Sequence, residues 1–364
     1  MNKIKIATRG NSYQVIIGYK VSKYLSHELR DKKIFFITDK NVYKLHKETI
    51  DRIYASCKQK EVYTFTATEK NKNFNELEKI LNQLTIKNFQ RDSIIVAIGG
   101  GIVGDIAGFA AAIFMRGIKF IQLPTTLLAA VDSSVGGKTG INYKGTKNLI
   151  GSFHQPSLVL ADTGFFDTLP KEEIICGIGE IIKYGFISTT KMFDFISDNF
   201  QKVLDLDYFV IDRIVAESIR IKGAVVKADE KELGLRKILN FGHTFAHAFE
   251  VSSGHKIKHG QAVIIGIACA LILSKNKHLI KADEFNRAIQ LIDKVKPFVL
   301  INGINKNDLI QIMMRDKKNR DGKIKFVLLK SIGEVLIDVE ARDSEILKAI
   351  NSALELFKDK NEIV

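Results

Sequence analysis

A run of glycines after an apolar segment is the first feature that could do chemistry. Gly99, Gly100 and Gly101 follow a strand predicted over 93–98 and precede a helix predicted over 102–115. Such glycines let the backbone approach an anion, and the first helical turn offers free N–H groups with partial positive charge. The G-x-G-x-x-G pattern therefore favours a nucleotide phosphate, although a tight turn that packs a helix closely against a sheet also explains it.

The acidic residue that usually holds the ribose of a dinucleotide is missing from its ordinary place. It normally lies about 20 residues after the glycines, where this chain has no acidic residue over 120–124. Asp39 instead ends an earlier predicted strand at 34–38. We predict that the Asp39 carboxylate accepts hydrogen bonds from the ribose hydroxyls.

Two lysines stand in segments rich in small residues. Lys138 follows Gly136 and Gly137, and Lys147 precedes Asn148. An ammonium group suits phosphate because it carries a compact charge and three donors. Single lysines are usually solvated, but the flanking Gly and Ser residues favour two loops that clamp an anion.

Histidines gather near the middle of the second half, where they could hold a metal ion. His243 and His247 are spaced i, i+4, so they share a helix face, and this spacing alone predicts both as ligands. A carboxylate ligand must then come from elsewhere. Glu180 lies with Lys183 in an apolar, glycine-flanked segment, where a charge needs a metal or an ion partner. A metal ligand and a simple Glu180–Lys183 salt bridge explain Glu180 equally well.

Strand and helix patterns alternate through the first half of the chain. Besides 34–38 and 93–98, strands are predicted at 119–123 and 158–161, and a helix at 73–84 has Asn73 as a suitable N-cap. This alternation predicts a mainly parallel, Rossmann-like sheet with helices on both faces.

The second half changes to long helical patterns. These run from 171 to about 314 and are followed by one predicted hairpin (323–329 and 334–339) and a helix at 344–357. We therefore predict an α/β domain over 1–170 and a mostly α-helical domain over 171–364, joined at Leu169-Pro170.

Composition narrows the class of protein. The 364 residues are 46% hydrophobic, and the three cysteines have no paired spacing, which fits a reducing compartment. The net charge is +14, but the lysines are scattered, so the charge does not indicate nucleic-acid binding. The N-terminus lacks an apolar signal core, and the apolar stretch at 262–273 is shorter than the ~20 residues that span a bilayer. We expect a cytoplasmic protein that binds neither nucleic acid nor membranes.

Several segments, taken together, closely resemble 3-dehydroquinate synthases. They are GGGIVGDIAGFAAAIFMRG, QLPTTLLAAVDSSVGGKTGIN, KNLIGSFHQP, GEIIKYG, ADEKELGLRKILNFGHTFAHAFE and KHGQAV. The matches run in order from Asp39 to 316–318 and so cover most of the chain. The resemblance implies an NAD-binding α/β domain followed by a mostly helical domain for metal and substrate.

The implied reaction is the second step of the shikimate pathway. The substrate is 3-deoxy-D-arabino-heptulosonate 7-phosphate, and the products are 3-dehydroquinate and phosphate. NAD acts catalytically in this family: a hydroxyl is oxidised, phosphate is eliminated, the carbonyl is reduced again, and the opened ring closes by an aldol step. The enzyme is a carbon–oxygen lyase without net redox change.

The resemblance also implies roles for individual residues. The ligands of one divalent ion, zinc or cobalt, are Glu180, His243 and His259, which moves His247 from the metal to the substrate. The implied NAD-binding residues are Asp39, Glu69, Lys72, Gly101, Ile102, Val103, Gly104, Asp105, Thr125, Thr126, Lys138, Lys147, Phe165 and Thr168. The implied substrate-binding and catalytic residues are Arg116, Lys138, Asn148, Lys183, Lys222, Arg236, Asn240, His247 and Lys318.

The chain departs from the family pattern at one place. The family usually has Gly-Glu-x-x-Lys near the NAD adenine, whereas Thr68 stands here before Glu69. The choice between Lys317 and Lys318 stays open. In the family the arginine that matches Arg116 reaches across a dimer interface, so we expect a homodimer.

Two rival functions share the implied cofactors. One is another sugar phosphate cyclase, of the inosose or valiolone synthase type, and the other is a metal-dependent polyol dehydrogenase. Four residues suit a substrate carboxylate and favour the dehydroquinate synthase: Lys222, Arg236, Asn240 and His247.

Overall fold

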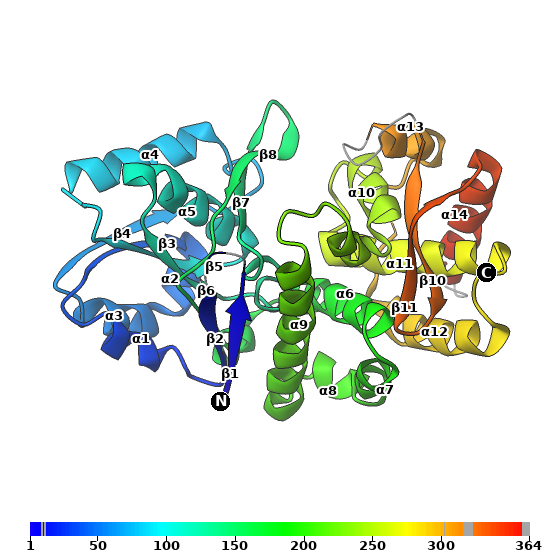
Figure 1. The fold of residues 1–364 in the computed structure, drawn as a ribbon, viewed down its shortest axis with the longest axis horizontal. Coiled ribbons are helices and arrows are strands. Elements are labelled where there is room, and N and C mark those ends of the chain that lie inside the picture. The colour runs from blue at the N-terminus through cyan, green and yellow to red at the C-terminus, as the bar shows by residue number, and fades with distance from the viewer. Residues whose placement is uncertain (9, 11, 302, 316–322, 359–364) are drawn as a thin grey trace. The chain divides into compact units, whose positions relative to one another are not determined.

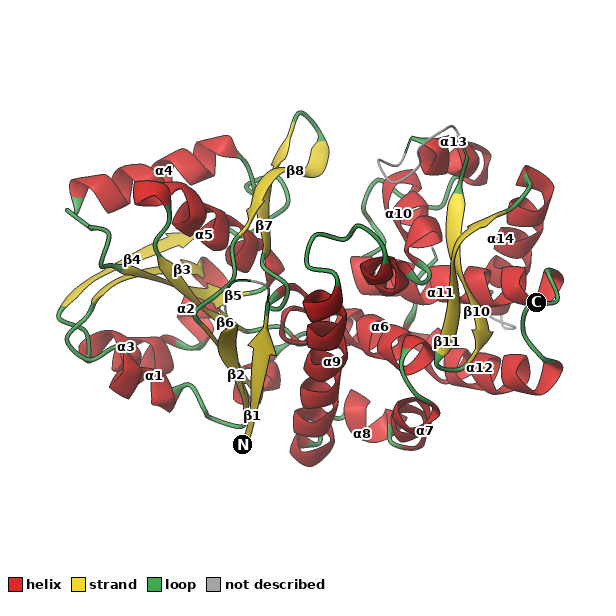
Figure 2. Cartoon of the chain, in the orientation of Figure 1, coloured by secondary structure: helices red, strands yellow, loops and turns green. Residues whose placement is uncertain are grey.

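The structure, a computed structural model, describes residues 1–8, 10, 12–301, 303–315 and 323–358. The chain divides into two compact units. The first comprises Met1–Ile174 and Leu206–Lys231, and the second comprises Ile175–Asp205 and Glu232–Val364. Figure 2 shows that strands and helices alternate in the first unit, whereas helices dominate the second.

A seven-stranded sheet forms the middle of the first unit. Its order is β1-β2-β9-β6-β5-β3-β4, and every neighbouring pair except β1 and β2 is parallel. The strands are β1 (Asn2–Ala7), β2 (Ser12–Gly18), β3 (Lys33–Asp39), β4 (Gln59–Phe65), β5 (Ile94–Gly99), β6 (Lys119–Pro124) and β9 (Leu158–Asp162). The four strands predicted from the sequence are β3, β5, β6 and β9, so the mainly parallel sheet is confirmed.

Helices cover both faces of this sheet (Figure 1). The long α4 (Phe74–Ile86) and α5 (Gly101–Ile113) pack on one face, in a buried apolar cluster with alternate residues of β3 and β5. The other face carries α1 (Lys23–Glu28) and α3 (Lys47–Ala55), where the rings of Tyr54 and Phe36 lie 5.8 Å apart. Asn73 caps α4 as predicted, because its side chain accepts the N–H of Glu76 at 3.0 Å. The short α2 (Lys40–Leu45) follows β3.

The segment interpreted as two lysine-bearing loops is instead a β-hairpin. Its strands, β7 (Lys138–Tyr143) and β8 (Thr146–Phe153), are antiparallel and bring Gly140 opposite Gly151. A Cβ on either glycine would collide with the backbone of the opposite strand. The small residues therefore serve a close strand pairing, and the prediction of loops was wrong.

The long helix α9 (Tyr208–Ala228) belongs to the first unit although it lies far beyond residue 170. It packs against β1, β2 and the π-helical turn η2 (Ala129–Ser133), and Gly223 makes room for Ile6. The compact units therefore differ from the predicted ranges, because residues 206–231 belong to the first unit. The predicted domain boundary at 170/171 stays a prediction. Two further 3-10 turns of this unit are η1 (Phe114–Arg116) and η3 (Thr163–Thr168).

The second unit is built from helices and one hairpin. Its helices are α6 (Lys171–Ile187), α7 (Thr190–Asp198), α8 (Phe200–Leu204), α10 (His243–Ser252), α11 (His259–Asn276), α12 (Ala282–Val295), α13 (Leu309–Met314) and α14 (Asp343–Phe357), with 3-10 turns η4 (Leu235–Asn240), η5 (Lys296–Phe298) and η6 (Lys306–Asp308). The strands β10 (Lys325–Ser331) and β11 (Glu334–Glu340) pair in antiparallel fashion, which confirms the predicted hairpin.

The core of this unit surrounds α11. This helix packs against α10, α12, α14 and β10. Among the described helices it alone is long and apolar enough to cross a membrane, but 83% of the 18-residue window is buried inside the unit. Burial of this kind is what a core helix of a soluble protein shows.

Glycines let three helices of this unit come into backbone contact. Gly179 of α6 lies against Gly260 of α11, and Gly242, which precedes α10, lies against Gly266 of α11. A Cβ on Gly179, Gly260 or Gly266 would collide with the backbone of the opposite segment. Gly242 also has φ +79°, a conformation that favours glycine. The helices can therefore cross at these points only if the glycines are kept.

We call Gly179, Gly242, Gly260 and Gly266 the contact glycines, and replacement of one of them tests this packing. We expect Gly260→Ala to lower the free energy of unfolding by about 1–3 kcal/mol, the usual cost of overpacking, because the new methyl group meets the backbone of α6 at Cys176. Urea denaturation measures the loss. Gly10→Ala is the control, since a Cβ there has nothing within 4 Å and its φ lies outside the left-handed region, and we expect a change within about 0.5 kcal/mol. Equal stability of both variants would contradict the packing argument.

Candidate functional site

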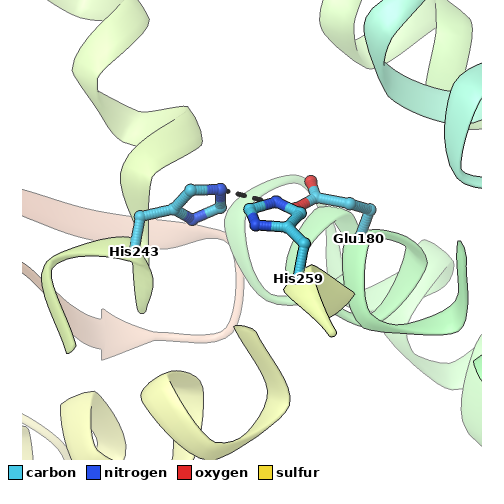
Figure 3. A group of neighbouring side chains, drawn as sticks. All are labelled: Glu180, His243 and His259. Atoms are coloured by element: carbon cyan, nitrogen blue, oxygen red, sulfur yellow. Dashed lines mark ion pairs between the residues drawn. The ribbon is translucent and has the colours of Figure 1, made fainter. Parts of the chain in front are cut away.

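Three side chains of the second unit meet at one point. Glu180 comes from α6, His243 begins α10 and His259 begins α11, and each is the chain neighbour of a contact glycine. Each offers one ligand atom, and these atoms lie within 4.8 Å of one another. Figure 3 shows the three side chains pointing toward each other. The arrangement is one that could hold a metal ion.

The distances within this group fit a tetrahedral ion. Glu180 Oε1 lies 3.4 Å from His243 Nε2 and 3.5 Å from His259 Nε2. Bonds of about 2.0–2.1 Å to a tetrahedral zinc ion separate neighbouring ligand atoms by about 3.3 Å. Glu180 Oε1 is buried and forms no hydrogen bond with the described residues. Because a buried oxygen without a partner is costly, the residues present fit a metal ligand set.

The carboxylate of Glu180 performs two tasks with its two oxygens. Oε2 forms an ion pair with Lys183, and both side chains are buried. Burial alone would raise the pKa of Glu180, but Lys183 and His243 outweigh it and hold this pKa well below its ordinary value. The sequence left a salt bridge and a metal ligand as equal interpretations. The structure contains the salt bridge and still leaves Oε1 facing the imidazoles.

The Nδ1 atoms of the two imidazoles each contact an oxygen that fixes the orientation of the ring. His243 Nδ1 donates to the carbonyl of Phe241 at 3.2 Å, and His259 Nδ1 lies 3.4 Å from Glu250 Oε2. These contacts at Nδ1 fix the rings so that both Nε2 atoms face Glu180. Metal-binding histidines are commonly oriented by such a hydrogen bond at the other ring nitrogen. Burial lowers the pKa of His243 to about 4. Burial also acts to lower the pKa of His259, but its contacts with the carboxylates of Glu180 and Glu250 prevail and raise this pKa to about 10.

His247 lies beside this group but outside it. Its ring centroid is 5.6 Å from that of His243 and 6.4 Å from that of His259. The pairing of His243 with His247 that the i, i+4 spacing suggests is therefore not the set that the structure brings together. The periodicity of one helix cannot reveal a third ligand that starts a different helix.

Other predicted residues of the second unit lie on neighbouring turns. Arg236 and Asn240 belong to η4; Arg236 is buried, and Asn240 Nδ2 donates to Glu232 Oε1 at 3.1 Å. Lys183 Nζ also lies 4.8 Å from the ring centroid of Tyr184. Lys318 falls outside the described residues.

In the first unit, the glycine loop joins β5 to α5 as predicted. Gly101, Ile102, Val103 and Gly104 form the first turn of α5. A Cβ on Gly101 would lie 3.2 Å from Ser133 Oγ, and one on Gly104 would lie 3.0 Å from Gln122 Oε1, so the loop is closely packed. These glycines leave the helix N-terminus uncovered by side chains of their own, which suits a phosphate.

Two threonines of the predicted NAD site flank this loop. Thr125 donates its N–H to the carbonyl of Gly99 at 3.0 Å. Its Oγ1 is buried and forms no hydrogen bond with the described residues. Thr126 Oγ1 accepts the N–H of Ala129 at 3.1 Å, and a Cβ on Gly100 would lie 3.3 Å from its methyl group. An unpaired hydroxyl beside a glycine-lined helix start fits a polar ligand such as a nucleotide.

Asp39 has a structural task in addition to the one predicted. Its Oδ1 accepts the N–H groups of Asn41 at 2.7 Å and Val42 at 3.2 Å, which caps α2. Its Oδ2 accepts the N–H of Ala67 at 2.8 Å. Oδ1 therefore accepts two hydrogen bonds and Oδ2 only one, so Oδ2 has a lone pair for a further donor. The ribose contact stays a prediction.

A partly buried ion pair links the loop to the segment that departs from the family pattern. Lys72 pairs with Asp105 of α5, and its Nζ donates to Asn148 Oδ1 at 2.5 Å. Burial raises the pKa of Asp105 and Lys72 opposes the rise. Glu69 accepts a hydrogen bond of 2.7 Å from Asn142. The structure therefore brings together four predicted residues: Glu69, Lys72, Asp105 and Asn148.

The remaining predicted residues of this unit lie at strand ends and turns. Lys222 of α9 is buried, and its Nζ donates to the carbonyl of Asp132 at 2.6 Å and to its Oδ1 at 2.7 Å. Lys138 is exposed at the start of β7, and Lys147 lies near the start of β8. Arg116 is exposed with φ +64°. Phe165 and Thr168 belong to η3.

Four residues that sequence reasoning missed contact these predicted residues. His46 Nε2 lies 2.9 Å from Thr168 Oγ1, and its ring is 4.7 Å from that of Phe165. Asp132 pairs with Lys222, Glu250 with His259, and Asn142 with Glu69. Asp132 and Asn142 stand in the motif already singled out around Lys138, which is a signal that could have found them. His46 and Glu250 carry no local signal.

Solved structures share this fold. A 2-deoxy-scyllo-inosose synthase, complexed with carbaglucose-6-phosphate, NAD+ and Co2+, superposes with a TM-score of 0.89 at 22% identity, covering 96% of this chain and 100% of that one. A 2-epi-5-epi-valiolone synthase from Streptomyces hygroscopicus, with NAD+ and Zn2+ bound, superposes with a TM-score of 0.87 at 24% identity, covering 96% and 98%. At such identities the likeness shows the fold alone.

Similarity in sequence is more specific. The model of the 3-dehydroquinate synthase N-terminal domain matches residues 62–176, and that of the C-terminal domain matches residues 177–319. The 3-dehydroquinate synthase of Pelagibacter ubique is 43% identical over 360 residues, covering 94% of this chain and 96% of the relative. That of Thermoanaerobacter pseudethanolicus is 41% identical over 356 residues, covering 96% and 100%. The chain therefore belongs to the 3-dehydroquinate synthase family.

Proposed function

We propose that this chain catalyses the 3-dehydroquinate synthase reaction. It converts 3-deoxy-D-arabino-heptulosonate 7-phosphate to 3-dehydroquinate and phosphate, with NAD used catalytically. The observation that carries the proposal is the grouping of Glu180, His243 and His259, with Glu180 Oε1 buried and without a hydrogen bond from the described residues. This group occurs in a chain about 40% identical to named 3-dehydroquinate synthases over nearly their full length.

The proposed metal ligands are Glu180 Oε1 and the two imidazole Nε2 atoms. A zinc or cobalt ion bound there would orient the substrate hydroxyls and lower the cost of removing a proton. Three protein ligands leave a position open for those hydroxyls. Lys183 contributes by holding Glu180 Oε2 in an ion pair, which keeps Oε1 turned toward the imidazoles.

The proposed NAD site is the edge of the sheet where β3, β5 and β6 end. Carboxyl ends of parallel strands are where nucleotides bind in folds of this class. Bound NAD would take a hydride from the substrate and return it within one turnover. The proposed contacts are those predicted from the family, from Asp39 to Thr168. Their support is the glycine-lined start of α5 and the buried, unpartnered hydroxyl of Thr125.

The proposed substrate residues are mostly cations. Lys222 and Arg236 are buried, and Lys222 forms an ion pair with Asp132. Ammonium and guanidinium groups also bind carboxylates and phosphates through charge-assisted hydrogen bonds. The heptulosonate phosphate carries a carboxylate and a phosphate, which suit such groups. The complete proposed set is Arg116, Lys138, Asn148, Lys183, Lys222, Arg236, Asn240, His247 and Lys318. We further propose a cytoplasmic homodimer, with Arg116 contributed across the dimer interface.

Two rival activities predict different products from the same assay. Purified protein is incubated with the heptulosonate phosphate, NAD and zinc or cobalt, while released phosphate and NADH are measured. We expect phosphate release without accumulation of NADH, because the hydride is returned before the product leaves. Steady NADH formation from a polyol would support the dehydrogenase instead. No turnover of this substrate, with turnover of glucose 6-phosphate or sedoheptulose 7-phosphate, would support a different cyclase.

Removal of one ligand tests the metal site separately. We expect His259→Ala to lower zinc affinity by more than about 100-fold, the upper range for loss of a residue that only orients a ligand. Metal content by mass spectrometry and titration against a zinc indicator measure the loss. His255→Asn is the control, because His255 is exposed and has φ +62°, which asparagine tolerates. Unchanged metal content in His259→Ala would refute the ligand assignment.

A further inference from the structure

Asn142 lies at an irregularity in the β7–β8 hairpin. The strand register shifts between Ile141 and Tyr143 of β7, and over the same stretch β8 advances from Thr146 to Ile150. The extra β8 residues form a bulge that contains Asn148, which has φ +50°. Bulges re-aim side chains and are frequent beside active sites. Here the bulge carries two residues that the proposed function uses, Lys147 and Asn148.

The side chain of Asn142 replaces the ladder hydrogen bonds that the bulge interrupts. Its Oδ1 accepts the N–H of Asn148 at 2.9 Å. Its Nδ2 donates to the carbonyl of Glu69 at 2.9 Å and to Glu69 Oε2 at 2.7 Å. Its own N–H donates to the carbonyl of Lys72 at 2.8 Å. One residue therefore ties the bulge to the segment 69–72 through four hydrogen bonds.

A second connection runs in parallel between the same two segments. Lys72 Nζ donates to Asn148 Oδ1 at 2.5 Å and also pairs with Asp105 in the first turns of α5. Lys72 is 3% exposed, so this connection is shielded from water. Hydrogen bonds therefore connect the bulge, the segment 69–72 and the first turns of α5 to one another.

Only an amide satisfies all of these partners. The position needs two donors toward Glu69 and one acceptor toward Asn148, and asparagine supplies both kinds of group. Aspartate would keep the acceptor, lose both donors and place a second carboxylate beside Glu69. Alanine would lose all three side-chain hydrogen bonds.

We propose that Asn142 is a positioning residue that couples the NAD-binding segment 69–72 to the bulge that carries Lys147, of the proposed NAD site, and Asn148, of the proposed substrate site. This inference rests on the proposed function, which assigns ligands to those two segments. Asn142 touches neither ligand in this assignment. It holds Asn148 and Glu69 in register, so that ordering of one segment by its ligand also orders the other.

The first test separates binding from chemistry. We expect Asn142→Asp to raise KM for both NAD and the heptulosonate phosphate about tenfold, as loss of one or two hydrogen bonds predicts, while kcat changes less than about threefold. The control is Asn199→Asp, the same exchange at a residue of the second unit outside both proposed sites, where the amide donates to the carbonyl of Phe195 at 2.9 Å. We expect both KM values of this control to stay within about twofold of the parent's. A rise in only one KM for Asn142→Asp, or in neither, would overturn the coupling.

Exchange of the amide at position 142 with the carboxylate at position 69 tests whether the binding loss can be rescued. In the double variant Asn142→Asp, Glu69→Gln, the new glutamine can donate to the new aspartate, which restores the hydrogen bond with its direction reversed. We expect each KM of the double variant to be at least about threefold lower than that of Asn142→Asp alone. Additive losses would show that Asn142 and Glu69 do not act through each other.

Hydrogen exchange tests the positioning without any turnover. We expect backbone amides of 142–149 and 68–73 to exchange faster together in Asn142→Asp, while those of β5 keep the parent's rates. Unchanged rates in either segment would refute the positioning role. If the parent protein releases no phosphate, the proposed function fails, and the exchange result still decides whether Asn142 joins the two segments.

Discussion

The candidate metal centre depends on backbone contact between helices. Gly179 against Gly260, and Gly242 against Gly266, bring α6, α10 and α11 closer than any side chain would permit. Each ligand is the chain neighbour of one of these glycines, so the helix crossings set the ligand distances directly. A site whose ligands come from packed helices is held more precisely than one built on loops. The apolar burial of α11 then serves the chemistry, because it keeps His259 at a rigid helix start.

Ion pairs stabilise acidic side chains in both units. Two acidic groups, the buried Glu180 and the partly buried Asp105, each have a lysine partner, Lys183 and Lys72. Neither pair is an isolated salt bridge, because Glu180 also faces two imidazoles and Lys72 also reaches Asn148. Buried charges are costly to retain unless such networks are satisfied. Their presence in both units is understandable if each unit holds part of the ligand set that the family resemblance implies.

Local sequence signals were reliable where structure is local. The strands β3 and β5, the Asn73 cap and the glycine turn were all predictable from neighbouring residues. Two features were not predictable, because they depend on contacts distant in the sequence. The hairpin β7–β8 looked like loops until Gly140 and Gly151 were seen to pair, and α9 packs with a unit whose other part ends at residue 174. In the same way, helical spacing suggested His247, whereas the group that could hold a metal ion includes His259, which starts another helix.

We propose that Glu180, His243 and His259 form the inner ligand shell of one divalent metal ion. X-ray absorption spectroscopy of the zinc-loaded protein examines that shell directly. We expect two imidazole nitrogens and one carboxylate oxygen at about 2.0–2.2 Å, with a further light ligand completing the site. A third imidazole, a sulfur ligand, or an ion surrounded only by water would contradict it.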